Sequence, residues 1–259
     1  RNMYLGGTSA VIADLRSLIN HERIIYLILA VVLIFLILSL TLSSTIVPIL
    51  FLTSIGAAVV YNLGSNIFLG QISYVTSAIA AVLQLGVTMD FSIFLMHRYI
   101  EEKNKSGNKE EAMAEAIHKT FVAIGASAAT ATAGFLSLSV MEIGLGKDMG
   151  IVMAKGVILG VIVSLTLLPA LILLCDDFVS RFRHRIFLPR FEWTARLVSK
   201  RYWVLLAMFV LLLFPAYYGK EHAPVFYNLS NALPRDIESI RSTEYIKQRF
   251  GSSDTLYLI

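Results

Sequence analysis

Long apolar segments dominate the pattern of hydrophobic and polar positions along the chain. Between Arg23 and Asp90 the sequence contains no Asp, Glu, Lys or Arg. Since one helical crossing of a bilayer takes about 20 residues, this stretch is long enough for about two crossings and most of a third. Further apolar segments follow along the chain. The pattern predicts membrane-spanning helices over residues 24–44, 46–69, 73–96, 120–141, 149–174 and 202–218.

Composition supports a membrane protein and argues against several other classes. Of the 259 residues, 56% are hydrophobic and 15% are charged, and the mean hydropathy is +0.71, far from the values of soluble domains. The net charge of +4 does not indicate a nucleic-acid partner, because the basic residues lie beside apolar segments. Cys175 is the single cysteine, and no His or Cys cluster has metal-ligand spacing, so we expect no disulfide, metal or cofactor.

Lysine and arginine gather in two connecting segments and predict the orientation in the membrane. The first segment is expected to be a polar loop over residues 98–119, and the second a linker over residues 177–201. Since cytoplasmic loops carry the excess of Lys and Arg, both segments should face the cytoplasm and both chain ends the outer side. The basic residues are Arg98, Lys103, Lys105, Lys109 and Lys119 in the loop, and Arg181, Arg183, Arg185, Arg190, Arg196, Lys200 and Arg201 in the linker.

The linker over residues 177–201 admits two interpretations. Its arginines act as a topology signal alone, or the segment forms an amphipathic helix in the headgroup layer. Phe178, Phe182 and Ile186 recur at four-residue spacing among the arginines, which is the pattern of an interfacial helix. We expect the linker to lie along the cytoplasmic interface, with Phe182 and Ile186 toward lipid.

The end of the chain is more polar than the rest. From Asn228 onward the pattern predicts a turn at Leu233 and Pro234, then an amphipathic helix over residues 236–250 and a strand over residues 255–259. A single strand is not stable alone, so we expect the chain to end just inside an extracytoplasmic α/β domain.

The expected fold is an all-α polytopic membrane bundle with partial extracytoplasmic α/β segments at both ends. We expect the chain to be a fragment of a longer protein. Its expected parts are the tail of one outer domain, a bundle of five helices, the basic linker, one further helix and the start of a second outer domain, over residues 1–22, 23–176, 177–201, 202–219 and 220–259.

Asp90 is a lone carboxylate within an apolar helix. It lies in the sequence Gly86-Val87-Thr88-Met89-Asp90-Phe91, and the next basic residue along the chain is Arg98. An ionised carboxylate inside a bilayer is costly, so we expect the group to face the bundle interior, to pair, or to bind a proton part of the time. A reversible proton carrier is the functional interpretation. The alternative is a structural Asp that is hydrogen-bonded to hydroxyls of the helix over residues 120–141.

Small and hydroxyl-bearing residues offer surroundings for this carboxylate. Gly86, four residues earlier, lies on the same helical face and lets a backbone or a water approach the group. Residues 125–134 are nearly all small, and Thr130 is the hydroxyl that we expect to take part in a proton path. Close helix packing is the alternative role for most of these small residues.

Lys155 is a second ionisable residue inside an expected span. Its long side chain can extend to the outer membrane surface, or it can act as an intramembrane charge partner in the bundle. Because Lys155 lies near the outer end of its helix, we do not expect it to pair directly with Asp90.

Enzyme classes find no support in the sequence. Intramembrane aspartyl proteolysis needs two carboxylates that share a proton, whereas Asp90 is the one available here. The H-E-x-x-H, G-x-S-x-G and P-loop signatures do not occur. We therefore expect a protein that is not an enzyme, and an ion gradient as the energy source for any uphill transport.

Several motifs occur together along nearly the whole chain. They are Gly86-x-x-x-Asp90-Phe91-x-x-x-Leu95 with His97-Arg98-Tyr99-x-Glu101-Glu102, then Ala133-Gly134-Phe135-Leu136-Ser137-Leu138, then Leu165-Thr166-Leu167-Leu168-Pro169-Ala170-Leu171, and Gly6-Gly7-Thr8 with Asp14-Leu15. In this combination the chain resembles the resistance-nodulation-division superfamily, and within it the MMPL-type lipid and drug exporters.

The resemblance implies a fold of twelve transmembrane helices in two repeats, each with an outer porter domain after its first helix. On this template the first five expected helices correspond to the second to sixth helices of the first repeat, and the last one to the first helix of the second repeat. The proton-relay position of the family corresponds to Asp90. Many members follow this Asp with Tyr, whereas this chain has Phe91, so a tyrosine hydroxyl is not part of the relay at that position.

The resemblance implies proton-driven export of a lipid or another hydrophobic, amphiphilic compound across a bacterial cytoplasmic membrane. Asp90, Gly86 and Thr130 are the expected relay residues. The expected partners are membrane lipids, the substrate, protons, and a second transmembrane repeat or another subunit. The alternative is a non-transporting sensor or an accessory subunit, because sterol-sensing domains and protein-translocation helpers are similar to this bundle.

Overall fold

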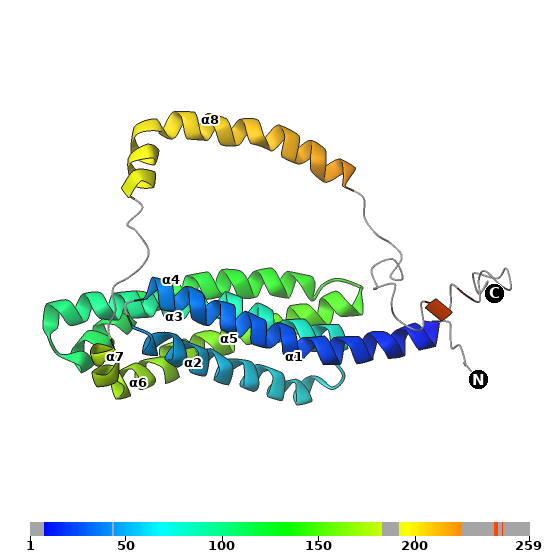
Figure 1. The fold of residues 1–259 in the computed structure, drawn as a ribbon, viewed down its shortest axis with the longest axis horizontal. Helices are drawn as coiled ribbons and strands as arrows, with labels where there is room; N and C mark the ends of the chain where they lie inside the picture. The colour runs from blue at the N-terminus through cyan, green and yellow to red at the C-terminus, as the bar shows by residue number, and fades with distance from the viewer. Residues whose placement is uncertain (1–7, 43, 183–191, 224–240, 243–244, 246–259) are drawn as a thin grey trace. The chain divides into compact units, whose positions relative to one another are not determined.

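A computed structural model describes most of the chain, apart from residues 1–7, 43, 183–191, 224–240, 243–244 and 246–259 (Figure 1). The chain divides into two compact units. One is a helix bundle, Leu18–Phe187, and the other combines Arg1–Ser17 with Leu188–Ile259. The turn, helix and strand expected after Asn228 lie almost entirely outside the described residues.

Helices make up nearly all of the described residues. Most of α1 lies in the bundle unit, and the other helices of this unit follow it in chain order. These elements are α1 (Thr8–Thr41), α2 (Ile46–Gly64), the short 3-10 helix η1 (Ser65–Leu69), α3 (Tyr74–Ser106), α4 (Lys109–Leu138), α5 (Gly144–Leu165), α6 (Leu167–Leu174) and α7 (Asp176–Arg181). The second unit contains α8 (Glu192–His222).

Six segments of the described chain are long and apolar enough to cross a membrane, which confirms the expected multi-pass membrane protein. They are Ile24–Thr41, Ile46–Leu69, Tyr74–Ser106, Lys109–Leu138, Gly144–Leu174 and Arg196–His222. The described residues contain no β-strand, so the α/β segments expected at the two ends are not seen there. Residues 8–22, which we expected to end an outer domain, belong to helix α1.

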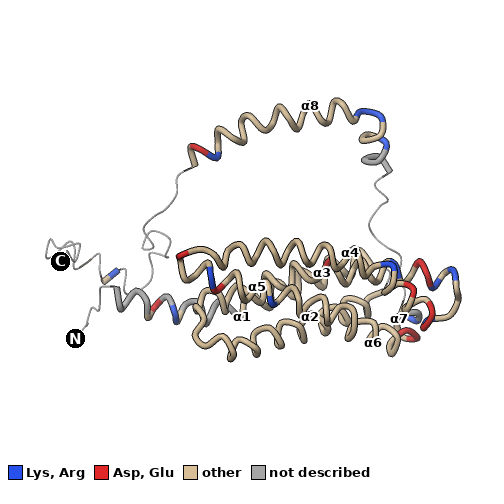
Figure 2. The backbone as a smooth tube through the Cα atoms, turned by 180° about the vertical axis from the view of Figure 1, so that it is seen from behind, with Lys and Arg blue, Asp and Glu red and all other residues tan. Residues whose placement is uncertain are grey.

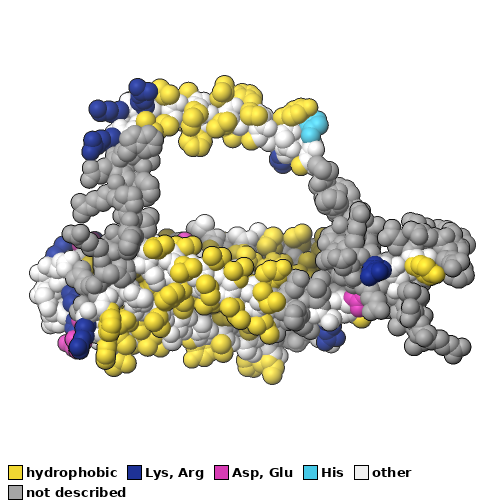
Figure 3. Space-filling view, in the orientation of Figure 1, with side chains coloured by type: hydrophobic (Ala, Val, Ile, Leu, Met, Phe, Trp, Pro, Cys, Tyr) yellow, Lys and Arg dark blue, Asp and Glu magenta, His cyan; other side chains and the backbone are white. Residues whose placement is uncertain are grey.

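Helix α3 is the central element of the bundle and packs against α2, α4 and α5. Its buried positions recur at three- and four-residue spacing, as expected for a helix with neighbours on several sides. They include Thr76, Ala80, Gln84, Thr88, Ser92, Leu95, Tyr99 and Glu102. Hydrophobic side chains are exposed over much of the bundle face seen in Figure 3, which suits a surface in contact with lipid tails.

Glycines of α5 permit the close approach of its neighbours. A Cβ atom at Gly150 would lie 2.6 Å from the Phe135 carbonyl oxygen and 2.7 Å from the Ser139 nitrogen, both on the backbone at the end of α4. A Cβ atom at Gly156 would lie 2.6 Å from the Asn62 side-chain nitrogen on α2. The small residues of α5 therefore set its distance from two different helices.

The polar loop expected over residues 98–119 is wrong, because most of this segment is helical. Helix α3 continues to Ser106 and α4 begins at Lys109. Gly107 ends α3 in the left-handed conformation, with φ of 72°, and the Asn108 side chain caps α4 by accepting a 3.1 Å hydrogen bond from the Glu110 nitrogen. Glycine tolerates positive φ and asparagine is a favoured N-cap, so two residues suffice for the turn.

Two other expected helices also differ from the structure. The helix expected over residues 149–174 is broken at Thr166 into α5 and α6, next to Pro169, which has no amide hydrogen to continue the backbone ladder. The last expected helix, over residues 202–218, is longer in the structure, and α8 has a kink at Arg201 with φ of −130° and ψ of 33°.

Charged residues gather at one end of the bundle, where α3 meets α4 and where α7 lies (Figure 2). We call this the basic end, and define it by Arg98, Lys103, Lys105, Lys109 and Lys119. Phe178 and Phe182 at α7 are exposed, as expected for contact with lipid. Ile186 lies outside the described residues, so the lipid contact of the whole linker stays a prediction.

Substitution of Gly150 by alanine should destabilise the bundle. The new methyl group would meet backbone atoms of α4 that cannot move independently, so we expect a cost of about 1–3 kcal/mol, typical of overpacking. Thermal unfolding of the purified protein in detergent would measure it. Gly64→Ala is the matched control, because no atom lies within 4 Å of its added Cβ. Equal stability of the two variants would contradict this account of the packing.

Cysteine labelling should test the orientation that the basic end predicts. In a variant with Cys175 replaced by serine, a cysteine at Ser106 should react with an impermeant maleimide only after the membrane is permeabilised. A cysteine at Met141, exposed at the other end of α4, should react in intact cells. The opposite pattern of labelling would reverse the orientation.

Candidate functional site

Asp90 lies on the exposed side of α3 and lines a cavity between α3 and α4. The cavity has a volume of about 280 Å³. It is lined by Asp90, Phe91, Phe94, Ala123, Ile124 and Ser127. Asp90 forms no hydrogen bond or ion pair within the described part of the chain. Of the three expectations for this carboxylate, an interior position and a partner are not seen within the described residues, and partial protonation stays a prediction.

Gly86 shares the exposed side of α3 with Asp90. It lies one helical turn earlier, and a Cβ atom built there would meet nothing within 4 Å. The open space beside the glycine leaves room for water or for another helix next to the carboxylate. The structure thus brings Asp90 and Gly86 together, as the four-residue spacing predicts.

Thr130 is not among the residues that line the Asp90 cavity. Its hydroxyl is exposed and donates a 2.9 Å hydrogen bond to the Ala126 carbonyl oxygen of its own helix. Ser127 supplies the hydroxyl on the α4 side of the cavity. Spacing alone could not identify Ser127, because the inference needs the burial of Ile124, which lies three residues earlier and lines the same cavity.

The small-residue segment of α4 packs little within this chain. Ala128 is buried, whereas most of its small neighbours are exposed. The exposed positions are Ala126, Ser127, Ala129, Thr130, Ala133 and Gly134. In a bilayer, small residues of this kind are typical of surfaces on which another helix packs closely.

Lys155 turns into the bundle and takes part in a polar network with α2 and η1. Its ammonium group donates hydrogen bonds of 3.0 Å to the Asn62 carbonyl oxygen and of 2.6 Å to the Asn66 side-chain oxygen. The Gln84 side chain accepts a 2.8 Å hydrogen bond from Asn62 and donates a 3.1 Å bond to the Gly156 carbonyl oxygen. Lys155 thus points inward, but these hydrogen-bond partners are neutral oxygens and do not include Asp90, so a role as an intramembrane charge partner stays a prediction.

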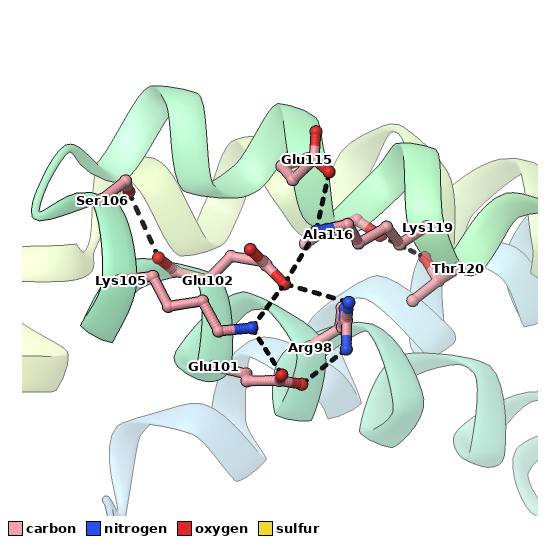
Figure 4. Close-up of polar contacts among 9 residues, drawn as sticks. All are labelled: Arg98, Glu101, Glu102, Lys105, Ser106, Glu115, Ala116, Lys119 and Thr120. Atoms are coloured by element: carbon pink, nitrogen blue, oxygen red, sulfur yellow. Dashed lines mark hydrogen bonds and ion pairs between the residues drawn. The ribbon is translucent and has the colours of Figure 1, made fainter.

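A cluster of charged residues joins α3 to α4 at the basic end (Figure 4). The side chain of Glu102 is only 8% exposed and lies 3.1 Å from Arg98, 3.3 Å from Lys105 and 3.2 Å from Lys119. Glu101 pairs with Arg98 at 2.6 Å and with Lys105 at 2.7 Å. Lys119 also pairs with Glu115 at 2.8 Å. Lys119 of α4 therefore bridges Glu102 of α3 and Glu115 of α4.

Comparison with known proteins identifies the family. Residues 2–210 match the MMPL family. The chain belongs to the MMPL family. It is 37% identical over 154 residues to the putative membrane protein ActII-3 of Streptomyces coelicolor, 40% over 90 residues to the putative membrane protein MJ1562 of Methanocaldococcus jannaschii, and 33% over 96 residues to the hopanoid transporter HpnN of Rhodopseudomonas palustris.

These relatives are much longer than the chain. The matches cover 57%, 35% and 37% of this MMPL chain, but 22%, 23% and 11% of the three relatives in the same order. The chain thus spans less than a quarter of the length of each of these three relatives. The motifs of α3 and α4 lie within the part that matches the family.

A second ionic contact of this MMPL chain joins α3 to α7. Asp176 accepts a 2.8 Å hydrogen bond from the Tyr99 hydroxyl and 2.6 Å bonds from the Lys103 ammonium group. Burial by itself would raise the pKa of Asp176, but the bonds from Lys103 and Tyr99 outweigh it and hold that pKa below its usual 3.8. The ionised form of Asp176 is therefore the form that stabilises the fold.

Replacement of Asp176 by asparagine should lower stability in a pH-dependent manner. Because the folded pKa is depressed, the contribution of the carboxylate is present above about pH 3.8 and is lost as the pH falls through the folded pKa. Thermal unfolding should show a large difference between parent and variant at pH 7 and a smaller one at pH 3. Asp177→Asn, at the exposed neighbour, is the control. A difference that does not change with pH would refute the role of the charge.

Proposed function

We propose that this chain is the proton-coupling part of an MMPL transporter that exports lipids or other hydrophobic, amphiphilic compounds across a bacterial cytoplasmic membrane. The proton-motive force would drive export, and Asp90 would bind and release the proton. The observation that carries the proposal is the unpaired carboxylate of Asp90 beside a cavity in a membrane-spanning helix.

The cost of a charge in the membrane explains how protonation could act on the protein. Ionised Asp90 is unfavourable against lipid or an apolar helix and favours contact with water or polar groups. Protonated Asp90 loses this preference. The two protonation states therefore favour different surroundings of α3, which is the property that couples proton binding to a conformational change.

The exposed face around Asp90 supports a partner helix. This face combines Gly86 and Asp90 on α3 with the exposed small residues of α4, such as Ala126 and Thr130. Small residues let helix backbones approach, and a carboxylate at such an interface would leave the lipid. We expect the partner to be a second transmembrane repeat or another subunit, and to supply the remaining relay groups.

The substrate class is inferred from relatives. One is named as a hopanoid transporter, and another, 27% identical over 174 residues, is named as the sulfolipid-1 exporter MmpL8 of Mycobacterium tuberculosis. Both names describe export or transport of a lipid. Together with the family match they favour transport over the sensor or accessory role considered from the sequence.

Replacement of Asp90 by asparagine should abolish proton-driven export and leave the fold intact. Asparagine has nearly the same volume but cannot ionise, and no hydrogen bond of Asp90 is lost within the described chain. Export of a lipid that the parent transports should be measured in vesicles with an imposed proton gradient, using the complete transporter that carries this segment.

Two variants control this experiment. Asp90→Glu retains an ionisable group and should keep part of the activity, whereas Asp177→Asn makes the same chemical change at an exposed site and should be neutral. Expression level and thermal stability should match the parent in all three variants. If Asp90→Asn exports lipid at more than a small fraction of the parent rate in a gradient-dependent way, Asp90 is not the coupling residue.

A further inference from the structure

A second cavity lies next to the Asp90 cavity, toward the basic end. It has a volume of about 520 Å³ and is lined by Phe94, His97, Arg98, Glu101, Lys119 and Thr120. Phe94 also lines the Asp90 cavity. The lining residues of both cavities come from α3 and α4 alone. The two cavities are therefore neighbours along the α3–α4 pair, with Phe94 in the lining of both, and we call them together the hollow.

His97 is the imidazole along this hollow. It follows Asp90 by seven residues, which is two helical turns, so it lies on the same side of α3 about 10 Å further along the helix. Its side chain is exposed and forms no hydrogen bond or ion pair within the described residues. Imidazole is the side chain that ordinarily binds and releases protons near neutral pH.

The charges around His97 are balanced. The charged groups that line its cavity are Arg98 and Glu101 from α3 and Lys119 from α4, while Asp90 lines the neighbouring cavity. The cations are neutralised within the cluster of Figure 4, which pairs three of them with three carboxylates, namely Arg98, Lys105 and Lys119 with Glu101, Glu102 and Glu115. A proton on His97 therefore meets no uncompensated positive charge at the mouth of the hollow.

We propose that His97 carries the proton between Asp90 and the cytoplasm. Protonated Asp90 gives its proton to water in the hollow, and that water gives a proton to the free ring nitrogen of His97. Asp90 becomes a carboxylate and His97 an imidazolium, which then releases one proton to cytoplasmic water and returns to its neutral form. The step transfers one proton and involves no oxidation.

Water is needed because the two groups are too far apart for a direct hydrogen bond. A separation of about 10 Å along α3 requires a chain of waters, each of which occupies about 30 Å³. The cavities of about 280 Å³ and 520 Å³ have room for such a chain. Ser127 and the polar groups near Arg98 offer hydrogen-bond partners at its two ends.

The inference rests on the proposed role of Asp90, and the test measures the proton on Asp90 rather than lipid export. The complete transporter would be reconstituted in vesicles, and the pH on the side of the basic end would be changed abruptly. Time-resolved infrared spectroscopy would follow the carboxyl stretching band that is lost in Asp90→Asn. That band reports when Asp90 gains or loses its proton.

His97→Gln should slow the response of the Asp90 band by on the order of tenfold or more, since it removes a proton-transfer group. His118→Gln is the matched control, because His118 is exposed on α4 and lines neither cavity. Imidazole added to the solution should restore the rate in His97→Ala and have no effect on the parent. A structural role of His97 would not produce this rescue.

Two different results would overturn the two proposals separately. If the Asp90 band responds in His97→Gln within a factor of about two of the parent rate, His97 does not carry the proton although Asp90 does. If no carboxyl band that responds to pH is lost in Asp90→Asn, Asp90 does not exchange protons. The proposed function then fails and the role of His97 fails with it.

Discussion

The packing of α3 against α2, α4 and α5 is the constraint on which the arrangement of polar groups depends. Because α5 approaches its neighbours through glycines such as Gly150 and Gly156, the helices leave no space for lipid between them. One side of α3 can then hold buried polar groups, including Gln84 and Ser92. The side that carries Asp90 lies at the edge of this packing, beside α4. The same helix thus carries buried polar groups with a structural role on one side and the exposed Asp90 carboxylate on the other.

The charges of the bundle are divided in a similar way. Lys155 is held by carbonyl oxygens in the interior, and Asp176 is held by Lys103 and Tyr99 at the basic end. Both groups are fixed by several bonds and are poor candidates for a cyclic change of charge. Asp90 and His97 have no such bonds within the described chain. For these two groups, which we propose as proton carriers, no bond within the described chain favours the protonated form over the deprotonated form.

The sequence predicts the membrane crossings and the position of Asp90 on α3, but not the connection between α3 and α4 or the α4 residue beside Asp90. Charge-free segments identified the six crossings because lipid excludes charge over a fixed thickness. The loop predicted over residues 98–119 follows from their polarity, but polar residues can also continue a helix. Ion pairs at three- and four-residue spacing, such as Arg98 with Glu102, stabilise the helix in this segment. The four-residue spacing of Gly86 and Asp90 was sufficient to place both on one side of α3. The choice of Ser127 over Thr130 required the rotation of α4 about its axis, which the sequence pattern does not give.

The short turn at Gly107 and Asn108 has a mechanical consequence. The turn and the ion pair of Glu102 with Lys119 connect α3 to α4 at one end. Beside Asp90, a cavity with a mainly apolar lining lies between the two helices. Two helices joined at one end change their separation most easily by pivoting about that joint, so a small rotation at Gly107 would be amplified along the length of both helices. The close packing of α5 on the far end of α4 at Gly150 opposes such a movement, so the width of the space between α3 and α4 depends on both of their ends.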